Sequence, residues 1–305
     1  MTYLVMTTDL TMAWRAFMNA DHTLFVLTLV ISTFGSYILD VVTVRELLNR
    51  VGIRVGFGEF LKTKGASYLL NIVNYNLALV LMVAMIRKRT DRGWGASGSP
   101  FLLLNFVDLS VFGALALLAV AAGETPFEPT ATIFVALFAA GALVAPPILC
   151  GLTRLEKLPG ILGRVFSHDI LAAFRHLEFR SIPWLMFLRS LLILLYAVMG
   201  WAFLHAFGVD VPILTLMVFM PILSLIAFVP VSVSGLGSTQ VVMREFLAPY
   251  VLPAVAVTSA AREAVIDAYS TSTIVSMILL RAVIGLVCLP WVSRTLAAAR
   301  PEQEP

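Results

Sequence analysis

The chain has 305 residues, of which 60% are hydrophobic and 13% are charged. Soluble domains are about one quarter charged, so this composition excludes an ordinary water-soluble protein. The net charge is +3, but the cations cluster between apolar runs and do not interleave with aromatic residues, which argues against nucleic-acid binding. The two cysteines, Cys150 and Cys288, are too few for a disulfide framework or a zinc site.

The first 22 residues form a segment unlike the rest of the chain. They lack the basic start, the continuous apolar run and the small-residue cleavage site of a signal peptide. Trp14, Phe17 and Met18 lie close to Arg15 in this segment, which predicts a short helix in the membrane interface. We therefore expect residues 1–22 to belong to the mature protein.

Six apolar runs are long enough to cross a bilayer, which requires about 20 helical residues. Two further apolar stretches contain polar residues or helix breakers at membrane depth. The sequence therefore predicts an all-α fold, a polytopic transmembrane helical bundle with about six to eight membrane segments, one or two of them re-entrant or broken. The six runs are 23–39, 101–122, 131–150, 184–207, 211–229 and 270–291, and the two irregular stretches are 66–86 and 239–257.

Lysine and arginine in the loops predict the orientation of the chain. The segments on both sides of 66–86 are strongly basic, and so is the loop at 151–183, which places all three in the cytoplasm. The loops at 123–130 and 208–210 contain no Lys or Arg and are expected outside. The flanking cations are Arg45, Arg50, Arg54, Lys62 and Lys64 on one side and Arg87, Lys88, Arg89 and Arg92 on the other.

The stretch 66–86 conflicts with this rule if it crosses the membrane, because one basic flank would then face outward. It contains Asn71, Asn74 and Asn76, whose amides need partners in hydrocarbon. We interpret it as a re-entrant helical hairpin that enters and leaves on the cytoplasmic side. The alternative is an ordinary span whose asparagines bond to neighbouring helices.

The loop at 151–183 is too long for a tight turn. Its apolar residues recur at helical spacing among charged ones, which predicts an amphipathic helix on the cytoplasmic surface, either contacting anionic headgroups or serving as a passive connector. These residues are Ile170, Leu171, Phe174, Leu177 and Phe179. The chain is thus expected to be one membrane domain, 1–305, made of an interfacial segment, two helical halves at 23–150 and 184–293, the connector between them, and a tail at 294–305.

The densest polar interruption lies at residues 228–240, which read FVPVSVSGLGSTQ. Pro230, Gly235 and Gly237 favour a broken helix, and a new helix is expected to begin near Ser238. Broken helices of this kind form substrate sites in many transporters. The alternative is a tight turn between helices at the membrane surface.

This stretch resembles the transmembrane region of lysylphosphatidylglycerol synthases and its stand-alone flippase-like relatives. The family pattern has a Pro, a few small residues, Gly-Leu-Gly, two more residues and a Glu. Pro230, Gly235 and Gly237 fit this pattern, while Gln240 stands where the family has Glu. Arg281 and the glycine four residues later look like the arginine and glycine of the family's last helix.

The resemblance extends to the first half of the chain. Tyr68 to Asn71 look like the start of the family's re-entrant segment, and Asp108 looks like the aspartate of its next helix. The family's Pro, Arg and Gly-Glu pair after its asparagine are replaced here, and Asn105 stands in place of an expected Arg. The resemblance implies translocation of lipids between leaflets, with no aminoacyl transfer, because a separate soluble domain performs that reaction in the synthases.

Charges inside apolar runs each cost about 2.5–3.5 kcal/mol at the centre of a bilayer on insertion scales. Asp108 is expected to face the protein interior, and Arg281 to pair either with Asp108 or with a lipid phosphate. Arg189 lies near the start of its span and is expected to reach the cytoplasmic interface. Arg244 and Asp267 are expected in the solvated interface, or Arg244 in a headgroup pathway.

No arrangement of residues typical of a catalytic or metal site is found in the sequence, so we expect no enzyme activity and no cofactor. The leading hypothesis is a multi-pass protein of the bacterial cytoplasmic membrane that moves a lipid or lipid-linked polar group between leaflets. The alternative is a non-transporting partner of a lipid-modifying enzyme. The residues expected to line the substrate pathway are Asn71, Asn74, Asn76, Asp108, Pro230, Gly235, Gly237, Gln240, Arg244 and Arg281.

Overall fold

The computed structural model describes residues 10–90, 92–123, 129–154, 168–217, 219 and 238–297. Regular structure in these residues is helical, and they contain no strand beyond one isolated bridge between Val209 and Val251. The helices are α2 (Leu10–Met18), α3 (His22–Arg50), α4 (Phe57–Val73), α5 (Tyr75–Thr90), α6 (Trp94–Ala121), α7 (Pro129–Leu152), η1 (Asp169–Leu171), α9 (Ala172–His176), α10 (Ser181–Ala206), α12 (Ser238–Leu247), η3 (Ala248–Tyr250) and α13 (Ser259–Ala297).

Five of these helices are long and apolar enough to cross a membrane, which confirms the prediction of a polytopic all-α membrane protein. The sixth expected span, 211–229, lies largely outside the described residues. The first span is longer than expected, because α3 continues to Arg50 and so contains Asp40 within its helix. The five segments are His22–Arg50, Trp94–Leu118, Thr132–Leu152, Ser181–Ala206 and Ser259–Ser293.

The chain divides into two compact units that alternate along the sequence. Unit 1 comprises Met1–Ser36, Leu118–Thr132 and Ile193–Leu280, and unit 2 comprises Tyr37–Leu117, Ile133–Leu192 and Arg281–Pro305. Each unit has its own hydrophobic core.

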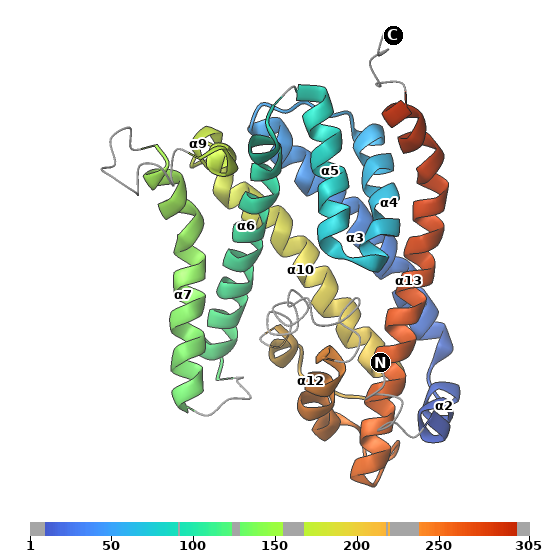
Figure 1. Cartoon of the computed structure of the whole chain (residues 1–305). Helices are drawn as coiled ribbons and strands as arrows, with labels where there is room; N and C mark the ends of the chain where they lie inside the picture. The colour runs from blue at the N-terminus through green and yellow to red at the C-terminus, as the bar shows by residue number, and fades with distance from the viewer. Residues whose placement is uncertain are drawn as a thin grey trace. The chain divides into compact units, whose positions relative to one another are not determined.

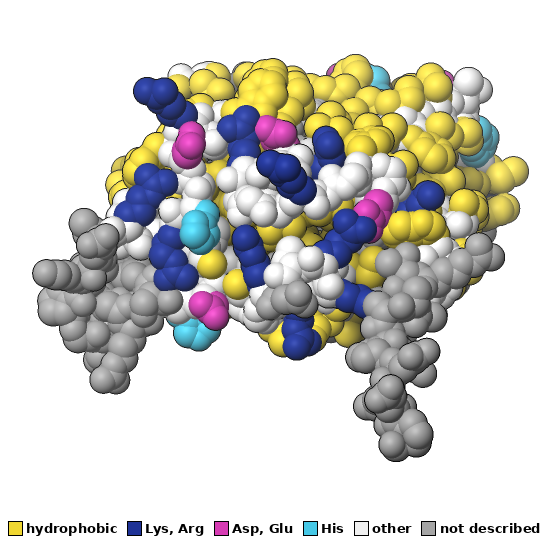
Figure 2. Space-filling view, turned by 90° about the horizontal axis from the view of Figure 1, so that it is seen from above, with side chains coloured by type: hydrophobic (Ala, Val, Ile, Leu, Met, Phe, Trp, Pro, Cys, Tyr) yellow, Lys and Arg dark blue, Asp and Glu magenta, His cyan; other side chains and the backbone are white. Residues whose placement is uncertain are grey.

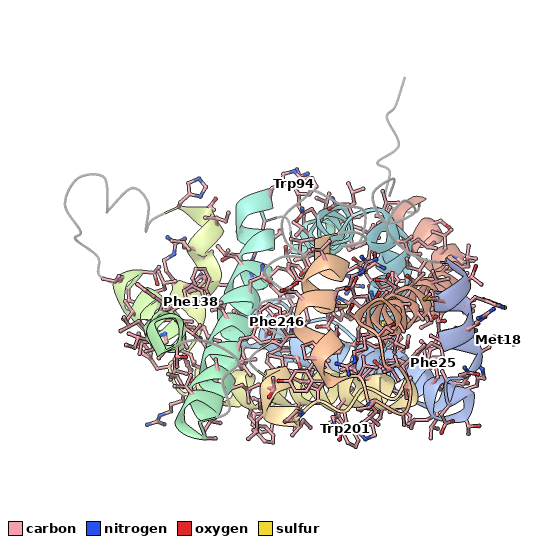
Figure 3. All side chains as sticks on the ribbon, turned by 90° about the horizontal axis from the view of Figure 1, so that it is seen from below. Met18, Phe25, Trp94, Phe138, Trp201 and Phe246 are labelled. Carbon is pink, nitrogen blue, oxygen red and sulfur yellow. The ribbon has the colours of Figure 1, made fainter. Side chains whose placement is uncertain are left out.

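The core of unit 1 is rich in aromatic rings. Phe25, which is labelled in Figure 3, packs against Phe203 and Phe207 with ring centroids 5.4 and 5.9 Å apart. The predicted N-terminal helix is present as α2, and its Phe17 joins this cluster. The helix expected near residue 238 begins at Ser238 as α12, but it ends at Leu247, so the stretch 239–257 does not form one long helix.

Unit 2 contains the predicted helical hairpin. Helices α4 and α5 lie side by side (Figure 1) and are separated by Asn74, whose backbone is extended. An ion pair between Glu59 and Arg89 joins the open ends of the hairpin. The apolar part of α5 runs from Tyr75 to Ile86, about 18 Å of helix and less than the thickness of a hydrocarbon core. Neither α4 nor α5 is among the described helices that are long and apolar enough to cross a membrane.

The basic segments flanking the hairpin gather at one end of unit 2, where Figure 2 shows many Lys and Arg side chains. Arg50 at the end of α3 donates to the hydroxyl of Ser181 at the start of α10, with a distance of 2.7 Å between Nη1 and Oγ. Three segments predicted to share one side of the membrane thus lie together. The exposed cations there include Arg50, Arg54, Arg87, Arg89 and Arg180.

The described part of the 151–183 loop differs from the expected surface helix. Between the end of α7 at Leu152 and the start of α10 at Ser181, its described helical residues are those of η1 and α9. Leu171, Phe174 and Leu177 are buried in the core of unit 2, whereas Ile170 and Phe179 are exposed. Most of this apolar face therefore packs against protein.

Candidate functional site

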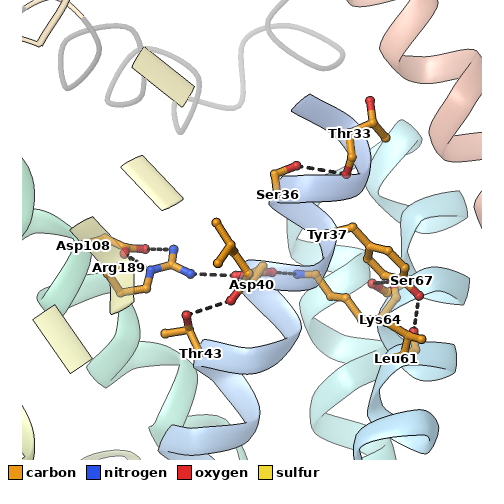
Figure 4. A network of polar contacts seen from close by, with 11 residues as sticks. Thr33, Ser36, Tyr37, Asp40, Thr43, Leu61, Lys64, Ser67, Asp108 and Arg189 are labelled. Atoms are coloured by element: carbon orange, nitrogen blue, oxygen red, sulfur yellow. Dashed lines mark hydrogen bonds and ion pairs between the residues drawn. The ribbon is translucent and has the colours of Figure 1, made fainter. Parts of the chain in front are cut away.

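Four charged side chains from four helices form a connected network in unit 2. Asp40 comes from α3, Lys64 from α4, Asp108 from α6 and Arg189 from α10. Asp40 accepts from Lys64 Nζ through Oδ2 and from Arg189 Nη1 through Oδ1, at 2.6 Å in each case. Arg189 also donates to both carboxylate oxygens of Asp108, through Nε and Nη2. Figure 4 shows the guanidinium between the two carboxylates.

The network is largely shielded from solvent. The exposed fractions of the side chains are 13% for Asp40, 13% for Lys64, 20% for Asp108 and 10% for Arg189. The formal charges of the two carboxylates and the two cations sum to zero. Each charged group contacts at least one group of opposite charge. Such mutual pairing is what allows ionised groups to persist away from water.

Aromatic residues beside the network fix the position of the hairpin. Tyr37 lies one helical turn before Asp40, and its hydroxyl donates to the carbonyl oxygen of Leu61 in α4. The ring of Tyr37 lies 5.4 Å from that of Tyr68, one turn beyond Lys64. The hairpin is therefore attached to α3 by an ion pair, a hydrogen bond and a ring contact.

Helix α13 packs tightly against α4. A Cβ atom on Gly65 would lie 2.5 Å from Cys288 Sγ, and one on Gly285 would lie 2.6 Å from Leu69 Cγ. A side chain at either position would force its neighbours to shift, so the two glycines favour this close approach. In this interface the Arg281 guanidinium lies over the ring of Tyr68, 5.5 Å from its centroid.

The observed pairing corrects two predictions. The described partner of Asp108 is Arg189, and both oxygens of Asp108 accept from it, so the expected pair with Arg281 is wrong. The expectation that Arg189 extends to the interface is also wrong, since its residue exposure is only 8%. Because Asp108 and Asp40 lie deeper along the bundle than the basic end, they hold the guanidinium inside it.

The three predicted asparagines lie at the turn of the hairpin. Asn74 Oδ1 accepts from the backbone N–H of Asn76 at 2.7 Å, which caps the start of α5. Asn71 and Asn74 are partly buried and Asn76 is exposed. These amides therefore shape the helix break, and they are separate from the four-charge network.

Unit 1 contains a second polar cluster, between α12 and α13. Arg244 Nε donates to Asp267 Oδ1 at 2.6 Å, and its Nη2 donates to Oδ2. The exposed fractions of the two side chains are 16% and 3%. The prediction of a solvated interface is therefore wrong for this pair. One turn away, Gln240 is 2% exposed and donates to hydroxyls of α13.

The remaining predicted pathway residues, Pro230, Gly235 and Gly237, lie outside the described residues. Sequence reasoning missed Asp40 and Lys64. The apolar run 23–39 ends just before Asp40, so hydropathy leaves this residue out, and Lys64 enters the sequence analysis only as a topology signal. No Pro or Gly separates Asp40 from the preceding apolar run or Lys64 from the residues just before it. Extending the predicted helices through these two positions would have included both residues in the helical bundle.

Within the described ranges, no group of three or more His, Cys, Asp and Glu side chains is placed to hold a metal ion. The polar groups instead form ion pairs and hydrogen bonds between helices. Such an arrangement can bind and exchange polar or charged groups inside an apolar protein.

The comparisons with known proteins give one match. The family model described as lysylphosphatidylglycerol synthase TM region matches residues 1–274. No curated protein and no solved structure matches the chain. With most of its length matched and its described helices arranged as a multi-pass membrane protein, the chain belongs to the lysylphosphatidylglycerol synthase transmembrane-region family, a membrane domain associated with lipid modification or flipping.

Proposed function

We propose that this protein moves a lipid or a lipid-linked polar group between the leaflets of the bacterial cytoplasmic membrane. The observation that carries the proposal is the buried network of Asp40, Lys64, Asp108 and Arg189, formed by helices that include three candidate membrane spans. Ionised residues within spans are costly and usually mark a pathway for a polar group.

The network also connects a short hairpin to longer helices. Lys64 belongs to α4, while its partner Asp40 belongs to the longer α3. A hairpin that enters the membrane without crossing it interrupts the bilayer on one side, which gives a headgroup a polar entrance while its acyl chains stay in lipid. The asparagines at the turn supply further polar groups at the opposite end of the hairpin from its basic ends.

The mechanism that follows is alternating exposure of a polar route. Arg189 is shared by Asp40 and Asp108, so a headgroup that competes for one of these partners leaves the guanidinium paired with the other. Partner exchange of this kind avoids an unpaired buried charge at each step. Movement of the hairpin would then open the route to one side at a time.

A second candidate function is a non-transporting partner or regulator of a lipid-modifying enzyme. The observation that favours it is the complete internal pairing of the network, since two carboxylates and two cations neutralise each other without a ligand. A network of this composition also suits a purely architectural role, fixing which helices pack together.

Reconstitution into liposomes separates the two functions. Purified protein is incorporated into vesicles with a trace of fluorescent lipid, and a membrane-impermeant quencher reports how much label changes leaflet. The transport proposal predicts faster exchange than in empty vesicles for at least one lipid of a panel that includes phospholipids, glycolipids and polyprenyl-linked sugars. The absence of exchange across the whole panel would contradict transport and favour the regulator.

Matched variants link the activity to the network. Asp108→Asn removes one carboxylate of the network, and Glu46→Gln removes a partly exposed one from the i,i+4 pair with Arg50 on α3. We expect Asp108→Asn to reduce exchange at least tenfold at equal incorporation and Glu46→Gln to leave it unchanged. Equal rates for the two variants would show that the network is not part of the pathway.

A further inference from the structure

Gln240 in unit 1 is a buried amide with an incomplete set of hydrogen bonds. It lies on α12, is 2% exposed and points toward α13. Its Nε2 donates to Ser270 Oγ at 3.2 Å and to Thr271 Oγ1 at 3.1 Å. Its Oε1 is shielded from solvent and accepts from no described residue.

The orientation of this amide follows from its neighbour. Ser270 donates its hydroxyl proton to the carbonyl oxygen of Asp267 at 3.2 Å. A serine has one hydroxyl proton, so Ser270 Oγ toward Gln240 acts as an acceptor and requires the NH₂ group there. The carbonyl Oε1 of Gln240 is therefore directed away from Ser270.

A second incomplete group lies on the same stretch of α13. Thr273 Oγ1 is buried and has no hydrogen-bond partner among the described residues, with 9% of the residue exposed. Residues three apart on a helix are neighbours on its surface, so Thr273 lies next to Ser270, which Gln240 contacts. Gln240 Oε1 and Thr273 Oγ1 are thus two polar atoms left unsatisfied by the described part of the chain that each belong to a neighbour of Ser270, and buried polar groups normally have partners.

The surroundings of these two groups are electrically neutral. Asp267 and Arg244, the nearest charged residues along the two helices on this side, form a bidentate pair. Gln240 itself carries no charge. An ammonium group at this position would be removed from water without a counter-charge, at a large cost in free energy. A hydroxyl group would donate to Oε1 and bond to Thr273 without that cost.

We propose that Gln240 and Thr273 bind a neutral hydroxyl-bearing headgroup, that of a sugar or polyol lipid. The identification of the ligand as a lipid headgroup rests on the proposed function, whereas the preference for hydroxyl over ammonium rests on the neutral, acceptor-bearing geometry. Gln240 and Thr273 are then specificity-determining residues.

The test measures binding to the purified full-length protein in detergent. Three short-chain probes share one diacylglycerol body: a glucosyl lipid, the same lipid with its sugar hydroxyls O-methylated, and a lipid with a primary ammonium headgroup. For the unsubstituted protein we expect the glucosyl lipid to bind at least ten times more tightly than either of the others. Equal affinities for the glucosyl and O-methylated lipids would overturn the proposal.

Substitutions test whether the preference for the glucosyl lipid depends on Gln240 and Thr273. Gln240→Met keeps the approximate size of the side chain but removes the acceptor, and we expect it to reduce the tenfold preference to near unity. Thr273→Val is expected to weaken it several-fold, and Gln240→Glu to favour the ammonium lipid. Glu245→Gln, on an exposed residue of α12, is the control and should retain the preference.

Folding and transport are measured in experiments separate from the binding assay. Each variant is compared by its thermal unfolding midpoint without lipid, and Thr273→Val serves as the milder change if Gln240→Met fails to fold. Persistence of the glucosyl preference in both variants would overturn the proposal, because the unpaired atoms would then be satisfied inside the protein. Binding with the expected preference but without leaflet exchange would overturn the transport function and leave this inference standing.

Discussion

Arg189 and Asp108 form a bidentate ion pair between α10 and α6, in which Nε and Nη2 of the guanidinium donate to the two carboxylate oxygens. The third nitrogen, Nη1, donates to Asp40 Oδ1. Arg189 therefore joins three helices through one planar group, a geometry that lysine cannot reproduce. The stability of unit 2 should depend on this residue more than on any single apolar contact near it.

We expect Arg189→Met to lower the free energy of unfolding by about 3–5 kcal/mol, because it leaves two buried carboxylates without their shared partner. Asp108→Asn should cost less, since Arg189 keeps Asp40. The double variant Asp108→Asn/Arg189→Met should be more stable than the sum of the single effects predicts. Chemical denaturation of the purified protein in detergent measures all three, and strictly additive losses would refute a direct interaction between the two residues.

Lys64→Met tests how the hairpin is attached. Lys64 pairs with Asp40, which still holds Arg189 after the substitution, so we expect a loss of about 1.5–3 kcal/mol, the usual contribution of a hydrogen bond to a charged group. Hydrogen exchange should accelerate in α4 and α5 more than in α6. Uniform acceleration across these helices would show that the ion pair does not act on the hairpin locally.

Two glycines in the α6 and α7 helices provide a matched test of packing. A Cβ atom on Gly113 would lie 2.5 Å from the backbone carbonyl oxygen of Ala139, whereas one on Gly141 would meet nothing within 4 Å. Gly113→Ala should therefore cost about 1–3 kcal/mol through forced separation of the helices. Gly141→Ala should be neutral or slightly stabilising. The thermal unfolding midpoints of the two variants measure the difference, and similar midpoints would contradict the close approach of α6 and α7.

The pair of Arg244 and Asp267 should behave as a buried interaction. Arg244→Met leaves the Asp267 side chain, which is 3% exposed, without this partner, and we expect a loss of about 3–5 kcal/mol. Adding Asp267→Asn should recover much of it. For comparison, Glu46→Ala breaks the partly exposed pair with Arg50 and should cost about 0.5 kcal/mol or less. Equal losses for Arg244→Met and Glu46→Ala, measured by chemical denaturation, would place Arg244 in the solvated interface after all.

The topology of the hairpin is open to direct measurement. In a background with Cys150→Ala and Cys288→Ala, single cysteines are introduced by Arg54→Cys before α4 and by Arg87→Cys near the end of α5. A membrane-impermeant thiol reagent should label both from the cytoplasmic face and neither from outside. Labelling of the two sites from opposite faces would establish an ordinary crossing.

The sequence was sufficient to predict the helices but not their lateral partners. Hydropathy and loop charge depend on local composition, which is why α6, α7 and α10 and the presence of a helical hairpin over 66–86 agree with expectation. The partner of Asp108 depends on which helices pack together, and hydropathy carries no information about that. Arg189 was therefore placed at the interface, although two carboxylates hold it inside the protein.

The same reasoning explains why Asp40 was overlooked. Asp40 directly follows an apolar run, and a span predicted from hydropathy ends before it. The backbone nevertheless continues as a helix to Arg50. The predicted span 270–291 begins with the polar residues 270–273. Only the structure shows that Gln240 donates hydrogen bonds to two of them. Sites formed by several helices require the tertiary arrangement, which single segments do not specify.

The mutual pairing of Asp40, Lys64, Asp108 and Arg189 also constrains how the sequence can evolve. A change at one of these positions leaves a buried charge uncompensated, so the route from one working combination to another passes through destabilised intermediates. Natural selection should therefore either preserve the four residues or replace them jointly. A relative that carries a neutral residue at the position of Asp108 is expected to have lost the arginine at position 189 as well.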